Sequence, residues 1–270
     1  MLWGDSLGGG AIEPVAAGVL LRVDSVGVRF GGIVALDSVS FDVTAGRIVG
    51  LIGPNGAGKT TLFNCLSRLY ECGSGDILFN GASLLRVPKH GIAALGIGRT
   101  FQNLALFKTM TVLDNIMVGH HSRTQSGFFV NALRLPLVTA EEGATLEKAK
   151  SLVRFLGLDA VAAARVADLP FGTQKRVELA RALACEPKLL LLDEPASGLN
   201  HEEVGELGVL IRDIRDRLGL TILLVEHHMS LVMSISDHVV ALNFGRKIAE
   251  GTPAEVQKHP EVIRAYLGTA

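Results

Sequence analysis

The feature that most constrains the fold is a short glycine-rich segment, 53-GPNGAGKT-60, which matches the pattern G-x-x-x-x-G-K-[ST] at every fixed position. An apolar run typical of a buried strand, 47-RIVGLIG-53, precedes it, and a segment with helical spacing, 59-KTTLFNCLSRL-69, follows it. Glycines let such a loop curl so that backbone N–H groups point inward at phosphate oxygens, and the helix N-terminus adds partial positive charge. This context favours a phosphate-binding loop over a chance glycine-rich turn.

The loop supplies candidate ligands for a nucleoside triphosphate and its metal ion. Lys59 is expected to reach the β- and γ-phosphates, and the Thr60 hydroxyl is expected to bind Mg²⁺. The residues predicted to contact the nucleotide here are Gly53, Pro54, Asn55, Gly56, Ala57, Gly58, Lys59, Thr60 and Thr61.

A second apolar run, 189-LLLLDEP-195, ends in two carboxylates. Ligands of open α/β sheets bind at the carboxyl ends of the strands, so Asp193 is expected to meet the Mg²⁺ held by Thr60. Glu194 is the predicted catalytic base that polarises a water for attack on the γ-phosphate. A solvated strand end is the alternative, and the presence of the phosphate loop disfavours it.

A third apolar run, 221-TILLVEHH-228, ends in a glutamate and two histidines. His227 is the predicted catalytic partner that hydrogen-bonds the γ-phosphate and holds Glu194 and the water in line. The alternative is that both histidines cap a helix or face water. A metal site formed by His227 and His228 is disfavoured, because adjacent side chains are expected to diverge.

Composition excludes several classes of protein. Basic and acidic residues are nearly balanced, 26 against 27, so the chain lacks the charge of a typical nucleic-acid binder. No apolar run approaches the roughly 18 residues that span a bilayer. The three cysteines are too few and too scattered for a disulfide framework or a zinc site, and we interpret them as buried thiols of a reducing compartment. Residues 1–19 have no periodicity or basic leader pattern, and we expect a flexible tail.

The rest of the chain alternates between strand and helix patterns. The segments 20–30 and 34–43 alternate apolar and polar residues, which predicts antiparallel strands. A region at about 104–184 has helical patterns at 111–121 and 140–158 and is expected to form a helical lobe. The predicted order after it is helix 174–184, strand 188–192, helix 201–218, strand 221–225, helix 229–235 and strand 237–243. Such alternation predicts a parallel sheet covered by helices.

With these motifs in this order, residues 20–267 resemble the nucleotide-binding subunit of an ABC transporter. The resemblance implies an α/β P-loop NTPase (RecA-like) core with an antiparallel β subdomain and an inserted α-helical subdomain, all within residues 20–270. It implies ATP and Mg²⁺ as ligands, and Phe30 as the aromatic that stacks on adenine, with a core strand residue as the alternative. Gln102, in 98-GRTFQN-103, matches the glutamine that contacts Mg²⁺ and links it to the membrane partner. The stretch 197-SGLN-200 matches a loop that touches the opposite subunit, with Asn200 in place of the usual aspartate.

The stretch 169-LPFGTQ-174 occupies the place of the family's signature loop, commonly L-S-G-G-Q. Pro170 stands for the serine, Phe171 for the first glycine and Thr173 for the glutamine, whereas Gly172 matches. In the family this loop contacts ATP bound by the other subunit of a head-to-tail dimer. The resemblance therefore implies that Pro170, Gly172 and Thr173 contact nucleotide across a dimer, and we expect a modified but working signature.

Two longer stretches, 98-GRTFQNLALFKTMTVLDNIMVGHH-121 and 251-GTPAEVQKHPEVIRAYLG-268, are similar to the ATPases of branched-chain (hydrophobic) amino-acid uptake systems. This implies an ATP-hydrolysing importer subunit on the cytoplasmic face of the inner membrane, paired with an identical or different ATPase. It also implies a permease that docks near Leu104–Met110, and a periplasmic solute-binding protein that acts indirectly. ATPases for urea, amides or lipid export, a soluble ABC ATPase of DNA repair or translation, and a P-loop kinase are the alternatives.

Overall fold

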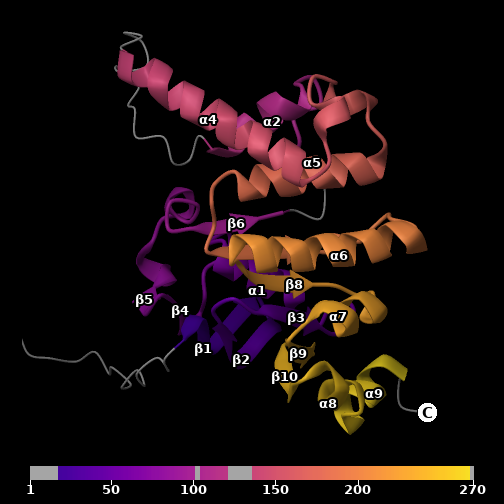
Figure 1. The fold of residues 1–270 in the computed structure, drawn as a ribbon. Coiled ribbons are helices and arrows are strands. Elements are labelled where there is room, and N and C mark those ends of the chain that lie inside the picture. The colour runs from indigo at the N-terminus through magenta and orange to yellow at the C-terminus, as the bar shows by residue number, and fades with distance from the viewer. Residues whose placement is uncertain (1–17, 101–103, 121–135, 268–270) are drawn as a thin grey trace, which may run out of the picture.

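Two sheets form the framework of the described part of the chain (Figure 1). The computed structural model describes residues 18–100, 104–120 and 136–267, with the side chains of 136–142 excepted. One sheet is antiparallel, in the order β2 (Ile33–Thr44), β1 (Val19–Phe30), β4 (Ser74–Phe79) and β5 (Ala82–Ser83). The other has the order β10 (Arg246–Gly251), β9 (His238–Asn243), β3 (Ile48–Ile52), β8 (Thr221–Val225), β7 (Leu189–Asp193) and β6 (Ile97–Arg99). Its neighbouring strands are parallel except for the β9–β10 pair.

The helices cover this second sheet and extend beyond it. Among the described residues they are α1 (Lys59–Leu66), α2 (Val112–His120), α4 (Pro136–Phe155), α5 (Phe171–Leu183), α6 (His201–Leu218), α7 (Met229–Ile235), α8 (Pro253–Gln257) and α9 (Pro260–Leu267). Figure 1 shows α2, α4 and α5 together at one end of the molecule, and α8 and α9 at the opposite end. The three helices at the first end occupy the region, about 104–184, for which the sequence predicts a helical lobe.

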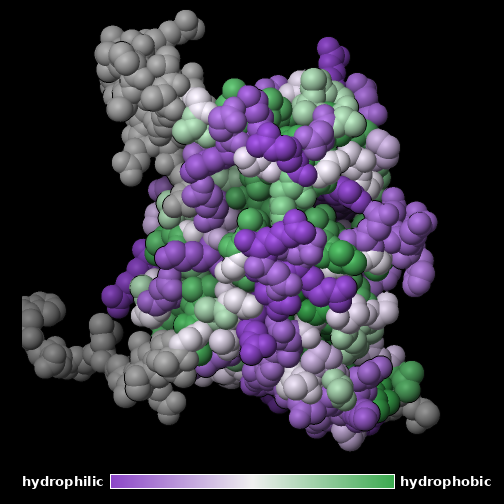
Figure 2. All heavy atoms as spheres, viewed as in Figure 1, coloured by the Kyte–Doolittle hydropathy of each residue, from purple (hydrophilic) through white to green (hydrophobic). Residues whose placement is uncertain are grey.

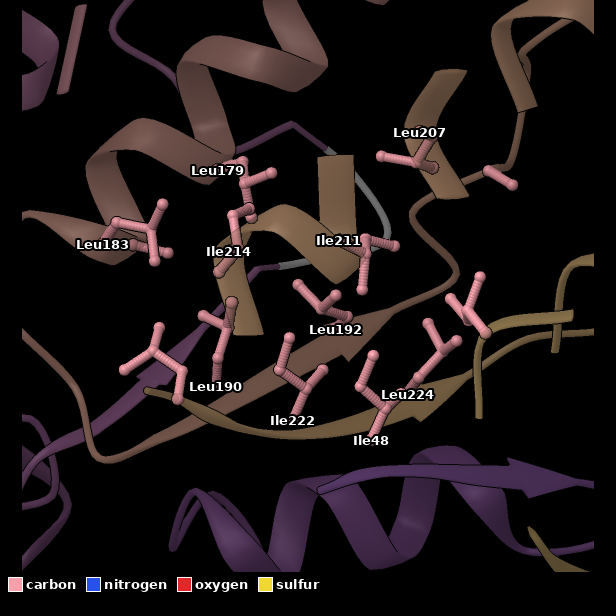
Figure 3. Close-up of a cluster of buried hydrophobic side chains, with 14 of the residues drawn as sticks. Ile48, Leu179, Leu183, Leu190, Leu192, Leu207, Ile211, Ile214, Ile222 and Leu224 are labelled. Atoms are coloured by element: carbon pink, nitrogen blue, oxygen red, sulfur yellow. The ribbon is translucent and has the colours of Figure 1, made fainter. Parts of the chain in front are cut away.

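The apolar strands are buried on both faces. In β7 every residue is buried; Leu190 and Leu192 belong to one hydrophobic cluster, and Leu189 and Leu191 to the other. Figure 3 shows the first cluster, where side chains of β3, β7 and β8 meet those of α5 and α6. Because successive side chains of a strand point to opposite faces, a continuous apolar run identifies a strand with cover on both sides. This packing fixes the strand ends at which the polar residues of the site begin.

Most predicted elements are present, with differences at their ends. The strands predicted at 20–30 and 34–43 are present as β1 and β2 and pair antiparallel. Strand β1 is one residue longer than predicted, and β2 is two residues longer. The helix predicted at 174–184 is wrong at its start, because α5 begins at Phe171 and includes Gly172 and Thr173 in its first turn. Strands β6 and β10 have no counterpart in the sequence prediction. The predicted tail lies outside the described residues up to position 17, and Val19 already belongs to β1.

The surface is predominantly polar on the face that Figure 2 shows, with hydrophobic side chains in small patches between hydrophilic ones. Within the described ranges, none of the helices has both the length and the apolar character needed to cross a bilayer.

Candidate nucleotide-binding site

The phosphate loop connects β3 to α1, as the sequence predicts, and its backbone requires glycine. Gly53 has φ +153°, and a Cβ there would lie 2.3 Å from the carbonyl oxygen of Leu242 in β9. Gly58 has φ +102°, and its Cβ would lie 2.7 Å from the carbonyl oxygen of Ala35 in β2. At either position, a residue with a side chain would require the backbone to move. The loop is therefore held in its curled form by close packing against both sheets.

The ammonium group of Lys59 lies inside this loop. The side chain is buried, and Nζ donates hydrogen bonds to the carbonyl oxygens of Gly53 at 2.7 Å and Pro54 at 3.0 Å. Burial lowers the pKa of Lys59, and the carboxylates of Glu194 and Asp193 oppose this shift. The first N–H groups of α1 receive no side-chain cap. A cation beside an uncapped helix N-terminus is a donor set that fits phosphate oxygens.

Asp193, at the end of β7, is almost fully buried and has a partner that the sequence did not indicate. Its Oδ2 accepts a hydrogen bond from the Arg99 guanidinium at 2.8 Å, and the two side chains are 3% and 9% exposed. Burial raises the pKa of Asp193, whereas Arg99 lowers it. The Arg99 guanidinium also donates hydrogen bonds to the side chains of Asn64, in α1, and Ser67, at the end of α1. This helix directly follows the phosphate loop. The carboxylate is thus tied to the segment that carries the loop.

Glu194 directly follows the strand and adopts a backbone conformation unusual for its residue type. Its φ is +48°, in the left-handed region, and its N–H donates to the carbonyl of Val225 at 2.9 Å. The Oε2 atom lies 3.8 Å from Nδ1 of His227, so the two side chains predicted to act together are neighbours. Strained backbone at such a position is common at functional sites.

Glu226 is a further residue of the site, and sequence reasoning gave it no role. It is fully buried, and Oε1 accepts the N–H of Ala196 at 2.6 Å. Its Oε2 accepts the N–H groups of His227 and His228 at 3.1 and 3.3 Å. One carboxylate therefore fixes both the turn after Glu194 and the backbone of His227. The sequence feature that could have identified Glu226 is its position as a charged residue directly after an apolar strand.

The expectation that the adjacent histidines diverge is wrong. The rings of His227 and His228 lie 4.7 Å apart, centroid to centroid, at an angle of 33°. Their ligand atoms and those of Glu226 lie within 4.8 Å of one another. The reason is local: both N–H groups bind the same carboxylate, which bends the backbone away from the extended form that separates neighbouring side chains. Because that carboxylate already accepts three backbone N–H groups, it is a poor metal ligand.

Phe30 stands at the end of β1, where the strand leaves the core. Val26 and Val28 on the same strand are buried, whereas Phe30 is 47% exposed. Its ring and that of Tyr70 pack edge to face, with centroids 5.2 Å apart and planes at 73°. The alternative interpretation of Phe30 as a core residue of the strand is therefore wrong. Its ring is exposed, as stacking on a ligand would require.

The signature segment forms the start of α5. Pro170 is the residue before the helix, and Gly172 and Thr173 lie in its first turn. A Cβ on Gly172 would lie 2.9 Å from Oε1 of Glu203 in α6. The Phe171 ring packs over Gly198, where a Cβ would be 2.8 Å from it. The aromatic that replaces a family glycine is thus accommodated by the glycine of the neighbouring loop.

Asn200, which departs from the family's aspartate, has a structural role at the start of α6. Its side chain accepts the N–H of Glu203 at 3.0 Å, and the Glu203 carboxylate accepts the N–H of Asn200 at 2.9 Å. This reciprocal arrangement is a capping box, in which asparagine and aspartate are equally suitable.

A groove of about 550 Å³ lies between β6, with the preceding residues 89–93, and the helices α2 and α5. Its walls include Leu69, Ile92, Ala93, Val118 and Arg181. The predicted docking segment, Leu104–Met110, is not part of these walls, although the Arg181 guanidinium binds the carbonyl of Ala105. Gln102 lies outside the described residues.

These features define a class of protein, the P-loop nucleotide-binding proteins with a mixed sheet and an adjoining group of helices. The comparisons with known proteins specify the family. A family model described as "ABC transporter" matches residues 36–197, more than half of the chain, and one described as "Branched-chain amino acid ATP-binding cassette transporter" matches residues 246–270. The chain belongs to the ABC transporter family.

Relatives and solved structures agree with this assignment. The branched-chain amino acid transport ATP-binding protein LivG of Escherichia coli is 43% identical over 93% of this chain and 98% of its own. BraF of Pseudomonas aeruginosa, a protein of the same description, is 41% identical with the same coverage. The ADP conformation of MJ1267, an ATP-binding cassette of an ABC transporter, has 29% identity and a TM-score of 0.80 over 93% of this chain and 99% of its own. The predicted fold class is confirmed.

Proposed function

We propose that the protein is the ATP-hydrolysing subunit of an importer for branched-chain or other hydrophobic amino acids. The observation that carries the proposal is the meeting of Lys59, Asp193, Glu194 and His227 at the ends of β3, β7 and β8. Likeness to LivG and BraF over nearly the whole chain supports the choice of solute.

Each residue of the site receives a role in this proposal. Lys59 and the N–H groups of the loop bind the β- and γ-phosphates, and Phe30 stacks on adenine. Thr60, Asp193 and Gln102 are the residues that would hold Mg²⁺, which neutralises charge on the phosphates when bound. Glu194 accepts a proton from the attacking water, and His227 orients the γ-phosphate and Glu194.

Hydrolysis in this proposal requires a second ATPase subunit, identical or different. The first turn of α5 presents the N–H groups of Gly172 and Thr173 together with the Thr173 hydroxyl, and these support contact with the partner's nucleotide. Pro170 has no N–H and contributes none. The permease is proposed to dock over Leu104–Met110, where Phe107 is 47% exposed. The groove beside this segment, whose Arg181 binds the carbonyl of Ala105, would extend the docking surface. The subunit would then lie on the cytoplasmic face of the inner membrane.

The catalytic part is tested with Glu194→Gln, measured by phosphate release and by gel filtration with and without Mg·ATP. We expect a loss of turnover of about 100-fold or more, because the base is removed. We also expect an ATP-dependent shift from monomer to dimer, because hydrolysis no longer opens the dimer. Glu202→Gln, a change at an exposed carboxylate in the first turn of α6, is the matched control and should keep normal turnover. Normal turnover in Glu194→Gln would refute the assigned role.

The transport part is tested by leucine uptake in a bacterium that lacks its own ATPase for this solute and carries the complete transporter of this protein. Wild type should restore uptake. Phe107→Asp should bind ATP normally but fail to copurify with the permease, whereas Val209→Asp, at a similarly exposed position on α6, should assemble. Assembly of Phe107→Asp would exclude the proposed docking surface, and absence of leucine uptake by wild type would exclude the proposed solute.

A further inference from the structure

A cleft lies between the phosphate loop and helix α9, far along the chain from the groove beside α2 and α5. Its volume is about 480 Å³, which is within the range of small-molecule sites. One wall is the first half of the loop, residues 54–57, and another is α9, which contributes Glu261 and Arg264. Lys59 and Thr60 are not among the residues that line it, so the cleft is separate from the predicted phosphate site.

The turn between β9 and β10 forms a further side of this cleft and presents an aromatic ring to solvent. Phe244 lines the cleft, is 84% exposed, and has φ +46°, in a region that bulky residues seldom adopt. The next residue fixes the turn in place. The N–H of Gly245 donates to the carbonyl of Ala57 in the phosphate loop at 3.1 Å, and its carbonyl accepts the N–H of Asp37 at 2.8 Å. The exposed ring is therefore held at a constant position beside the loop.

Two opposite charges lie one helical turn apart on α9 and line the cleft together. Among the described residues Glu261 and Arg264 form no ion pair, although this spacing allows one. Glu147 and Lys150, also three residues apart, pair at 2.8 Å in α4. The Arg264 Nε atom donates to the carbonyl of Pro260, in its own helix, at 3.4 Å. Both charges are therefore available to a ligand that carries an anion and a cation close together.

Helix α9 is anchored, so these charges also have a fixed place. Val262 is 3% exposed and belongs to the same hydrophobic cluster as Val256 of α8 and Ala249 of β10. Helix α8, which precedes α9, begins with a capping box between Thr252 and Glu255. The walls of the cleft are thus all carried by packed or hydrogen-bonded elements.

We propose that this cleft binds a free amino acid with an apolar side chain, as the zwitterion. Arg264 binds the α-carboxylate and Glu261 the α-ammonium group, while Phe244 and Ile248 cover the apolar side chain. A fatty acid leaves Glu261 without a partner, and a nucleotide places further negative charge beside it. The proposal rests on the proposed function for the choice of leucine as the ligand, because an apolar amino acid is the solute proposed there.

The shared wall joins this ligand to nucleotide binding. Residues 54–57 line the cleft and also belong to the loop whose N–H groups are predicted to bind phosphate. An amino acid that changes the affinity of the loop for ATP must itself be bound more or less tightly by the same factor when ATP is present. An imported amino acid can in this way act directly on the ATPase.

The test is isothermal titration calorimetry of the full nucleotide-free chain with L-leucine and three analogues. Each analogue lacks one recognised group: 4-methylpentanoate has no ammonium, leucinamide has no carboxylate, and glycine has no apolar side chain. We expect leucine to bind, and each analogue to bind more weakly by about 10-fold or more. That factor corresponds to the loss of one hydrogen bond to a charged group or of one buried apolar side chain.

Variants with matched controls locate the binding. Arg264→Gln and Phe244→Asn change exposed side chains, and asparagine tolerates the left-handed backbone, so both should melt as wild type does. Each should weaken leucine binding by about 10-fold or more. Arg86→Gln and Ile33→Asn, at exposed positions that do not line the cleft, should bind leucine normally.

Three results would overturn the proposal. They are the absence of leucine binding up to about 10 mM, unchanged binding in Arg264→Gln, and binding of 4-methylpentanoate as tight as that of leucine. The proposed function fails in a different way. A chain that binds leucine in this cleft, but whose complete transporter takes up no leucine, would contradict the proposed solute and not the cleft.

Discussion

The ion pair between Arg99 and Asp193 offers the sharpest test of how this site is built. Arg99→Met keeps most of the side-chain volume but leaves a buried carboxylate without its guanidinium. Removal of one partner from a buried pair costs about 3–5 kcal/mol of unfolding free energy. The pair Arg22 and Asp42 is the matched control, because its contact is as short, 2.9 Å, but its side chains are 15% and 37% exposed. Arg22→Met should cost about 1 kcal/mol or less.

The pH dependence of this loss has a definite sign. Burial already raises the pKa of Asp193, and removal of Arg99 takes away the main influence that lowers it. The folded variant therefore binds a proton more readily than the unfolded chain does. Its deficit should be complete above the raised pKa of the folded state and should shrink as the pH falls toward the ordinary range of aspartate.

The assay is urea unfolding of both variants and wild type at several pH values from neutral to mildly acidic. Adding Asp193→Asn to Arg99→Met should recover part of the loss, because the stranded charge is removed. Two results would refute the reasoning: an Arg99→Met deficit as small as that of Arg22→Met, or a deficit that does not change with pH.

Three further predictions follow from the local geometry. Phe30→Ala should weaken ATP binding by roughly 5- to 100-fold, which is the free energy of one stacking contact. The melting temperature should change little, because the ring is half exposed, and titration with a fluorescent ATP analogue tests the affinity. Gly53→Ala should lower the free energy of unfolding by about 2–3 kcal/mol, because its Cβ would clash with the Leu242 carbonyl. Gly32→Ala, which has open space around it, is the control and should change the calorimetric stability little. Asn115→Ala should cost about 1–3 kcal/mol in chemical unfolding, because this buried amide both accepts from and donates to the backbone of residue 107.

Much of the architecture was accessible from the sequence because its signals are local. Continuous apolar runs identified β3, β7 and β8, and the residues at their ends are those that meet in the site. Strands β6 and β10 escaped prediction for physical reasons. Residues 97–99 are too few to show a pattern, and β10 is an edge strand whose side chains are mostly solvated, so its sequence lacks an apolar signal.

The contacts that organise the site could not be predicted, because they join segments distant in sequence. Arg99 and Asp193 are separated by 94 residues, and only the pairing of β6 with β7 brings them together. The start of α5 was misplaced for another reason. Gly172 is a poor helix former, which favours a loop, but its packing against Glu203 compensates in the folded chain.

The three carboxylates at the ends of β7 and β8 are held in different ways, which supports the role that we propose for Glu194. The Asp193 carboxylate is paired with Arg99 through Oδ2, and Glu226 accepts three backbone N–H groups, so both are held in position. Glu194 directly follows Asp193 on a left-handed backbone, with its Oε2 atom 3.8 Å from Nδ1 of His227. The neighbouring carboxylates thus hold the backbone before and after Glu194 in place. The role of general base that we propose for Glu194 requires a fixed position of this kind, which adjacent acidic residues in a sequence do not reveal by themselves.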